Sequence, residues 1–123
     1  MRAAGALAAA LQDPGLQAAA LEALRHMGSA ALGELERAFP AAGPEGRRLI
    51  VDLAGRMDDR RARRLLLSAL ADDSAQVRTE AAHALGDGGF LEAVQPLMDV
   101  KASDPSPGAR QAAAAALKKL APR

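Results

Sequence analysis

The sequence predicts an all-α fold, an α–α superhelix of about four helical hairpins that occupies residues 1–123 as a single domain. The first observation is a repeat. Asp72–Leu85 and Asp104–Leu117 share, in register, an acid, a serine, a small aliphatic residue, an arginine, an alanine pair and a final Ala-Leu. Repetition at such a period is typical of stacked repeats. The second observation is composition: half of the residues are hydrophobic, alanine dominates them, and only two residues are aromatic. Such a core suits closely packed helices better than strands.

Turn signals divide the first half of the chain into four helices. The first ends before Asp13-Pro14, where the second begins, because an acid can cap free N–H groups and proline suits a first helical turn. Gly28-Ser29 separates the second helix from the third. The stretch 40–46, rich in proline and glycine, separates the third from the fourth. The fourth keeps the apolar spacing of the repeat but lacks its Val-Arg pair.

The second half contains four more helices. They begin after acids or serines near 57–59, 72–74 and 103–106, and Gly86–Gly89 ends the sixth, because glycine accepts the left-handed conformation of a helix end. Pro96 lies inside the seventh and should delay its start or bend it. The eight expected helices span about 3–11, 14–27, 29–39, 45–56, 58–70, 74–86, 90–101 and 106–120.

The stretch from Asp72 to Leu97 resembles the HEAT-like repeat of phycobilisome lyases and many other bacterial proteins. The matching positions are Asp72, Val77-Arg78, Ala81-Ala82, Ala84-Leu85-Gly86, Gly89, Ala93-Val94 and Leu97. The last segment matches through Ala109-Arg110 and Ala116-Leu117, and the opening pair of helices matches weakly. The resemblance implies a right-handed superhelix whose first helices form the convex side and whose second helices line the concave side.

An acid and an arginine recur at one repeat position, as Asp72 with Arg78 and Asp104 with Arg110. The resemblance implies a structural ladder that ties each hairpin to the next. The planar fork of arginine suits a carboxylate in such a place. Direct contact of these arginines with a ligand is the alternative.

The most informative local feature is an arginine cluster, formed by Arg47, Arg48, Arg56, Arg60, Arg61, Arg63 and Arg64. On a helical wheel, Arg60, Arg64 and Leu67 form a ridge opposite the apolar face, with Arg63 beside them. Repeat alignment places Glu34, Gln95 and Asp99 alongside this ridge. It places Glu92 at the position of Arg60 one repeat on, which predicts a pair of the two across hairpins. Three interpretations stay open: a solvated face, a site for an acidic protein segment, and a nucleic-acid backbone site, although nearby acids dilute the positive charge.

The sequence gives little support for catalysis. It has no cysteine and no glycine-rich phosphate loop, and its two histidines, His26 and His83, stand alone. Deoxyhypusine hydroxylase, an iron enzyme of similar fold, carries His-Glu where this sequence has Thr79-Glu80. The HEAT-like alkylpurine DNA glycosylases rely on aromatic stacking, for which this chain has neither Trp nor Tyr. We therefore expect no enzyme, no catalytic residue, no metal and no cofactor.

The predicted function is a protein-interaction scaffold or adaptor that binds through the concave face, with nucleic-acid binding or a bilin lyase-like accessory role as alternatives. The net charge of +1 provides no field for nucleic acid or membrane. We expect a cytoplasmic protein that does not associate with membranes. Ala112–Ala116 has no following helix to cover it. Either Lys118, Lys119 and Arg123 cap it in a monomer, or the chain belongs to a longer array or associates with itself through its terminal helices.

Overall fold

The computed structural model describes the backbone of residues 2–121 and the side chains from residue 5 to residue 121. Within this range every regular element is a helix, which confirms the predicted all-α repeat fold. The α-helices are α1 (Arg2–Ala10), α2 (Gln17–Met27), α3 (Leu32–Ala38), α4 (Pro44–Gly55), α5 (Arg60–Ala69), α6 (Ala75–Gly88), α7 (Val94–Ser103) and α8 (Pro107–Leu120). Three short 3₁₀ turns, η1 (Gly28–Ala31), η2 (Phe39–Ala41) and η3 (Leu91–Ala93), adjoin α3 and α7.

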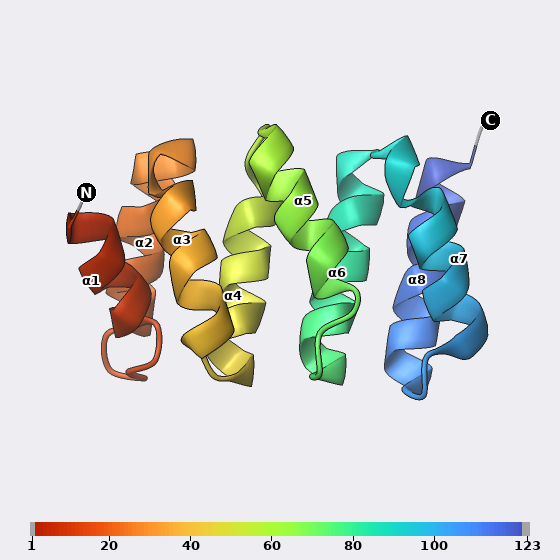
Figure 1. The fold of residues 1–123 in the computed structure, drawn as a ribbon, viewed down its shortest axis with the longest axis horizontal. Coiled ribbons are helices and arrows are strands. Elements are labelled where there is room, and N and C mark those ends of the chain that lie inside the picture. Colours follow the sequence, from red (N-terminus) through yellow and green to blue (C-terminus); the bar gives the residue numbers. More distant parts are fainter. Residues whose placement is uncertain (1, 122–123) are drawn as a thin grey trace.

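The helices form two layers that run side by side from one end of the molecule to the other (Figure 1). One layer contains α2, α4, α6 and α8, and the other contains α1, α3, α5 and α7. Successive helices alternate between the layers, and in the layer of α2, α4, α6 and α8 each helix packs on the next. The two ends of the chain therefore lie at opposite ends of the row (Figure 1).

The core lies between the layers and consists almost wholly of leucine and alanine. Leu24, Leu53 and Leu85, which end the apolar pattern of successive repeats, are all but inaccessible to solvent. Small residues let α4 and α6 approach closely: a Cβ added to Gly55 would stand 2.8 Å from the Cβ of Ala84. A core with so few large side chains depends on this close packing for its contacts.

The helix boundaries differ from the sequence expectation where turns compete with helix. The second helix begins at Gln17 rather than near Pro14, because Asp13 accepts the backbone N–H of Gly15 at 2.9 Å and holds a turn there. The third and seventh helices each open with a 3₁₀ turn. Pro96 lies in the first turn of α7, where its missing N–H costs no helical hydrogen bond.

Candidate protein-binding face on helix α5

Helix α5 separates its charges from its apolar side chains. Asp59 caps the helix by accepting the backbone N–H of Arg61 at 2.7 Å. The apolar positions Ala62, Leu65, Leu66 and Ala69 are buried in the core. Their spacing leaves the arginines on the opposite, outward side of the helix. The candidate site on this side, the α5 face, is formed by Arg60, Arg61, Arg63 and Arg64.

Two of these arginines present their charge to solvent. Arg60 and Arg64 are exposed, and among the side chains of residues 5–121 no carboxylate lies within 4 Å of either guanidinium. Arg61 is also exposed, but it lies 3.9 Å from a carboxylate oxygen of Glu36 and 3.8 Å from one of Asp59. The α5 face therefore holds two cations without a partner and a third that is loosely paired.

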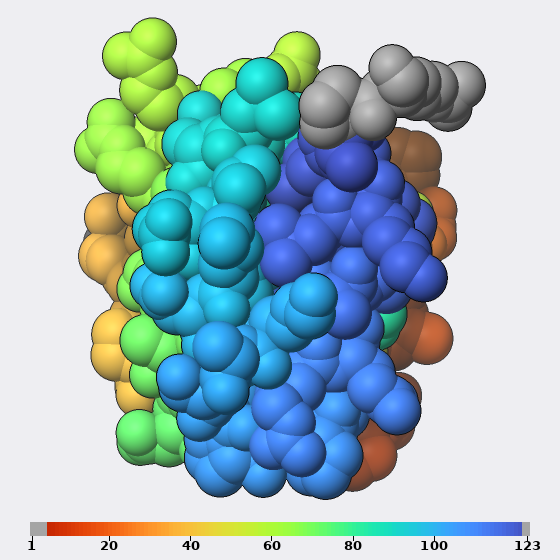
Figure 2. Space-filling view, turned by 90° about the vertical axis from the view of Figure 1, so that its right-hand side faces the viewer, coloured from red at the N-terminus to blue at the C-terminus, as the bar shows by residue number. Residues whose placement is uncertain are grey.

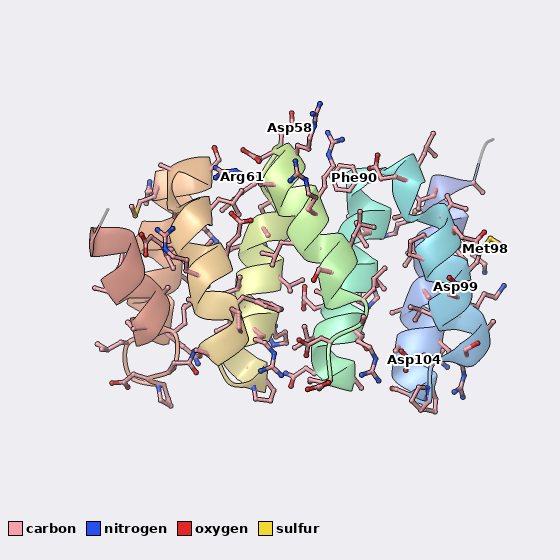
Figure 3. All side chains as sticks on the ribbon, viewed as in Figure 1. Asp58, Arg61, Phe90, Met98, Asp99 and Asp104 are labelled. Atoms are coloured by element: carbon pink, nitrogen blue, oxygen red, sulfur yellow. The ribbon has the colours of Figure 1, made fainter. Side chains whose placement is uncertain are left out.

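Arg63 is held in place by an aromatic ring. Its guanidinium carbon lies 4.6 Å from the centroid of Phe90, and a guanidinium nitrogen lies 3.7 Å from Asp58. A cation over an aromatic face is attracted by the ring quadrupole. The ring itself rests on Gly88, where an added Cβ would stand 2.5 Å from it. Figure 3 shows Asp58, Arg61 and Phe90 at one edge of the molecule.

One atom of Arg63 lacks a hydrogen-bond partner. Its Nε is buried without an acceptor among the described residues. A buried donor without a partner is unfavourable, and the charged group it belongs to gains most from an added acceptor. The contact of Phe90 with Arg63 was not predicted from the sequence, although Phe90 is one of only two aromatic residues in the chain.

The other residues predicted for the site are less accessible or are occupied. Leu67 is partly buried and packs against the core. Glu34 pairs with Arg37 on its own helix and lies against Gly5 of α1. Gln95 donates to Asp99 at 3.1 Å along α7. The anticipated pair of Arg60 with Glu92 is not formed among the described side chains. The cationic surface that lacks carboxylate partners among the described residues is thus smaller than predicted and is centred on α5.

The remaining arginines of the predicted cluster belong to α4 and serve other contacts. Arg48 binds Glu45 and reaches Glu80 of α6 at 3.5 Å. These contacts hold the pKa of Glu45 below its ordinary value, mainly through the hydrogen bonds from Arg48. Arg56 lies 3.5 Å from Asp52. The seven arginines are therefore not one surface.

The ladder residues lie at the opposite edge of the molecule from Phe90, where Figure 3 labels Asp104. Arg78 donates hydrogen bonds to both carboxylate oxygens of Asp104, at 2.7 and 3.0 Å, and to the carbonyl of Asp72 at 2.8 Å. Arg110 donates to the carbonyl of Asp104 at 2.6 Å. Hydrogen bonds from Arg78 hold the pKa of Asp104 below its ordinary value, against the opposing effect of its burial. Arg78 thus joins the turn before its own helix to the next repeat, whereas Arg110 contacts only the turn before its own helix among the described residues.

The ladder is longer than the sequence indicated. In α4, Arg47 lies 3.1 Å from Asp72 and donates to the carbonyl of Ala42 at 2.6 Å. In α2, Gln17 donates to the carbonyl of Leu11 at 2.9 Å. Both side chains occupy the position of Arg78. The place of Arg47 in the ladder could have been found from its polar side chain three residues into α4. It was overlooked because α4 lacks the Val-Arg pair of the repeat.

Nothing in the described part of the chain gathers metal ligands. No group of three His, Cys, Asp or Glu side chains there could hold a metal ion. At the position of the His-Glu pair discussed above, Glu80 faces Arg48 beside Thr79, so these residues do not fit such a site. No helix among the described residues is long and apolar enough to span a bilayer.

The family model for HEAT repeats matches residues 34–118, well over half of the chain. The chain belongs to the HEAT-repeat family. The comparison does not confirm the narrower resemblance to phycobilisome lyases. No curated protein matches this HEAT-repeat chain.

Among solved structures, the HEAT-repeat chain is similar to human deoxyhypusine hydroxylase in complex with glycerol. The TM-score is 0.74 and the sequence identity is 27%. The similarity covers 95% of this chain but 43% of the human one, so this chain spans less than half of that enzyme.

This similarity overturns the prediction that the chain is not an enzyme. The prediction was based on the usual role of stacked repeats as binding surfaces, but a similar stack occurs in an enzyme. A stack of helical repeats therefore does not by itself exclude catalysis.

Proposed function

We propose that this HEAT-repeat chain is a protein-interaction module whose α5 face binds an acidic segment of a partner protein. The observation that carries the proposal is the pair Arg60 and Arg64, two exposed cations for which the described side chains supply no carboxylate. Like charges four residues apart on a helix repel each other, and bound carboxylates relieve that repulsion.

The third element of the face is the fixed guanidinium of Arg63. Phe90 orients it, and its buried Nε lacks an acceptor among the described residues. A carboxylate that reached the outer nitrogens of this guanidinium would gain a charge-assisted hydrogen bond with little loss of side-chain freedom, because the arginine is already ordered. The surrounding exposed arginines would draw the acidic segment toward it.

A nucleic-acid backbone is a poorer match. Asp58, Asp59 and Glu36 lie among the arginines, where they would face phosphates at close range. Phosphate binding is favoured by an uninterrupted cationic surface.

The test measures binding of two fluorescent probes, a twelve-residue Glu/Asp-rich peptide and a mixed-sequence DNA oligonucleotide. The variant Arg60→Glu with Arg64→Glu is compared with Arg25→Glu with Arg56→Glu, which changes the charge equally at two exposed sites, one in α2 and one directly after α4. We expect the α5 variant to weaken peptide binding at least tenfold and the control variant to weaken it less than threefold.

Equal losses in the two variants would mean that peptide binding reflects overall charge alone and would refute the proposal. Tighter binding of the oligonucleotide, with a steep salt dependence, would assign the face to nucleic acid instead.

A further inference from the structure

Arg60 and Arg64 lie one turn apart on α5, and the described side chains supply neither with a carboxylate partner. Side chains four residues apart on a helix are neighbours, with Cβ atoms about 5–6 Å from each other. Helix α5 itself contains four arginines and no acidic residue. The nearby acids, from the turn before α5 and from α3, lie beside Arg61 and Arg63 instead. Two positive charges are therefore concentrated between Arg60 and Arg64.

The start of α5 is open to a partner. Figure 2 views the row from the end that α7 and α8 form, and the residues around the start of α5 project at its upper left, in yellow-green, beyond α7. Arg60 and Arg64 are exposed, whereas the apolar side chains of the same helix are buried in the core. A partner can reach this pair of arginines without displacing any other element of the described chain.

A single carboxylate is a poor match for two guanidiniums. It carries one negative charge and two oxygens, and one arginine uses both oxygens when the two groups bind edge to edge. A phosphate monoester carries a charge of about −1.5 to −2 at pH 7 and has three acceptor oxygens. Such a group can accept hydrogen bonds from two guanidiniums at once, and its charge balances that of the pair.

Two carboxylates would supply the same charge at a greater entropic cost. Each would bring its own side chain, whose rotamers become fixed on binding. A phosphorylated serine places both charges on one short side chain. Acids that flank it in the same segment remain available for Arg61 and for the guanidinium of Arg63, which Phe90 holds in place.

We propose that the acidic segment bound by the α5 face contains a phosphorylated serine or threonine, whose phosphate bridges Arg60 and Arg64. This inference rests on the proposed function and specifies the chemistry of the partner. A single phosphate needs only the space between these two arginines, whereas a nucleic-acid backbone would extend over the acids beside Arg61 and Arg63. Phosphorylation of the partner therefore strengthens its binding.

The test uses three fluorescent twelve-residue acidic peptides that differ only at a central position, which is serine, phosphoserine or glutamate. Each is titrated with the parent chain and followed by fluorescence anisotropy. The phosphoserine peptide should bind about tenfold more tightly than the serine peptide and about threefold or more above the glutamate peptide. Inorganic phosphate should compete far more weakly than unlabelled phosphopeptide, because it lacks the flanking acids.

Three single variants locate the phosphate on the α5 face. Arg60→Gln and Arg64→Gln should each remove the advantage of phosphoserine over glutamate, because one guanidinium is then left to match two charges. Arg61→Gln is the matched control, since it removes the same charge from the same helix at an exposed residue that already has carboxylates nearby. It should weaken both peptides alike and leave their ratio unchanged. Circular dichroism verifies the helical content of each variant.

The outcomes separate this inference from the proposed function. Equal affinities for the three peptides, still dependent on the α5 arginines, would overturn the phosphate bridge and leave the acidic segment in place. Binding that none of the α5 arginines affects would overturn both. A phosphoserine advantage that falls equally in Arg61→Gln would show that the phosphate responds to overall charge and would overturn the bridge. Displacement by inorganic phosphate as readily as by unlabelled phosphopeptide would refute a protein partner.

Discussion

Gly86 lies so close to α8 that a Cβ at this position would stand 2.7 Å from both the Cα and the Cβ of Ala116. Backbone and side chain of α8 fill the space that any larger residue would need. The contact fixes how near two successive repeats can pack, since neither atom belongs to a flexible side chain that could move aside. Glycine is needed here for space and not for an unusual backbone conformation.

We predict that Gly86→Ala destabilises the chain by about 1–3 kcal/mol, because overpacking forces α6 and α8 apart. Gly33→Ala in α3 is the control, because only the far end of Arg37 lies near, at 3.9 Å. There alanine should stabilise the helix by up to about 1 kcal/mol. Urea denaturation measures both. A gain in stability at position 86 would contradict the packing argument.

Replacing Arg78 by glutamine should cost about 3 kcal/mol, because it leaves the buried carboxylate of Asp104 without its counter-charge. The matched control is Arg48→Gln, which breaks the more exposed pair with Glu45 and should cost less than about 1 kcal/mol. Thermal and urea unfolding give both values. Similar losses for the two variants would show that the ladder adds no more than a surface ion pair.

Acid should weaken the fold through Asp104. Its folded-state pKa lies below the ordinary value of 3.8, chiefly because Arg78 donates hydrogen bonds to it. The unfolded chain therefore takes up the proton first as the pH falls. The stabilisation is complete above about pH 5 and is lost as the pH passes 3.8 and then the lowered folded-state pKa. Glu45 contributes in the same direction through Arg48.

The check is the free energy of unfolding between pH 7 and pH 3. In Arg78→Gln the decline toward low pH should be shallower than in the parent chain, because the cause of the lowered pKa is gone. Parallel declines in the two proteins would assign the acid sensitivity to other groups.

Phe90→Leu should weaken binding of the acidic peptide about two- to fivefold, because a cation–π contact at an accessible site is worth roughly 0.5–1 kcal/mol. Arg63 would then lose its orientation while the charge of the α5 face stays the same. Phe39→Leu, at the other aromatic residue, is the control and should leave the affinity unchanged. Fluorescence anisotropy distinguishes the two, and equal affinities would remove Phe90 from the site.

The repeat, the helix order and half of the ladder could be predicted because they follow from local patterns. Acid, arginine and Ala-Leu at fixed spacing identify the stack wherever one repeat resembles the next. The place of Arg47 in the ladder was not predicted, because its partner, Asp72, lies in the following repeat. In addition, its own helix begins with Gly-Pro and not with an acidic turn.

The environment of Arg63 could not be foreseen for a similar reason. Its partner ring comes from the turn after α6, and only the packed structure brings the two together. Helical periodicity correctly separated the buried side of α5 from its charged side. It could not distinguish arginines that face solvent, such as Arg60, from one that lies against an aromatic ring.

The ladder also determines how the molecule can bend. Its bidentate, largely buried ion pair joins repeats along one edge, whereas at the other edge the pairs between repeats, Arg61 with Glu36 and Lys119 with Asp87, are exposed. Exposed pairs resist separation weakly. Ion pairs therefore tie the repeats more strongly at the edge of Asp104 than at the edge where Phe90 and Arg61 lie. The α5 face lies on the edge with the exposed pairs, so the distance from its arginines to acids of neighbouring repeats, such as Glu36, can change while their spacing along α5 stays fixed.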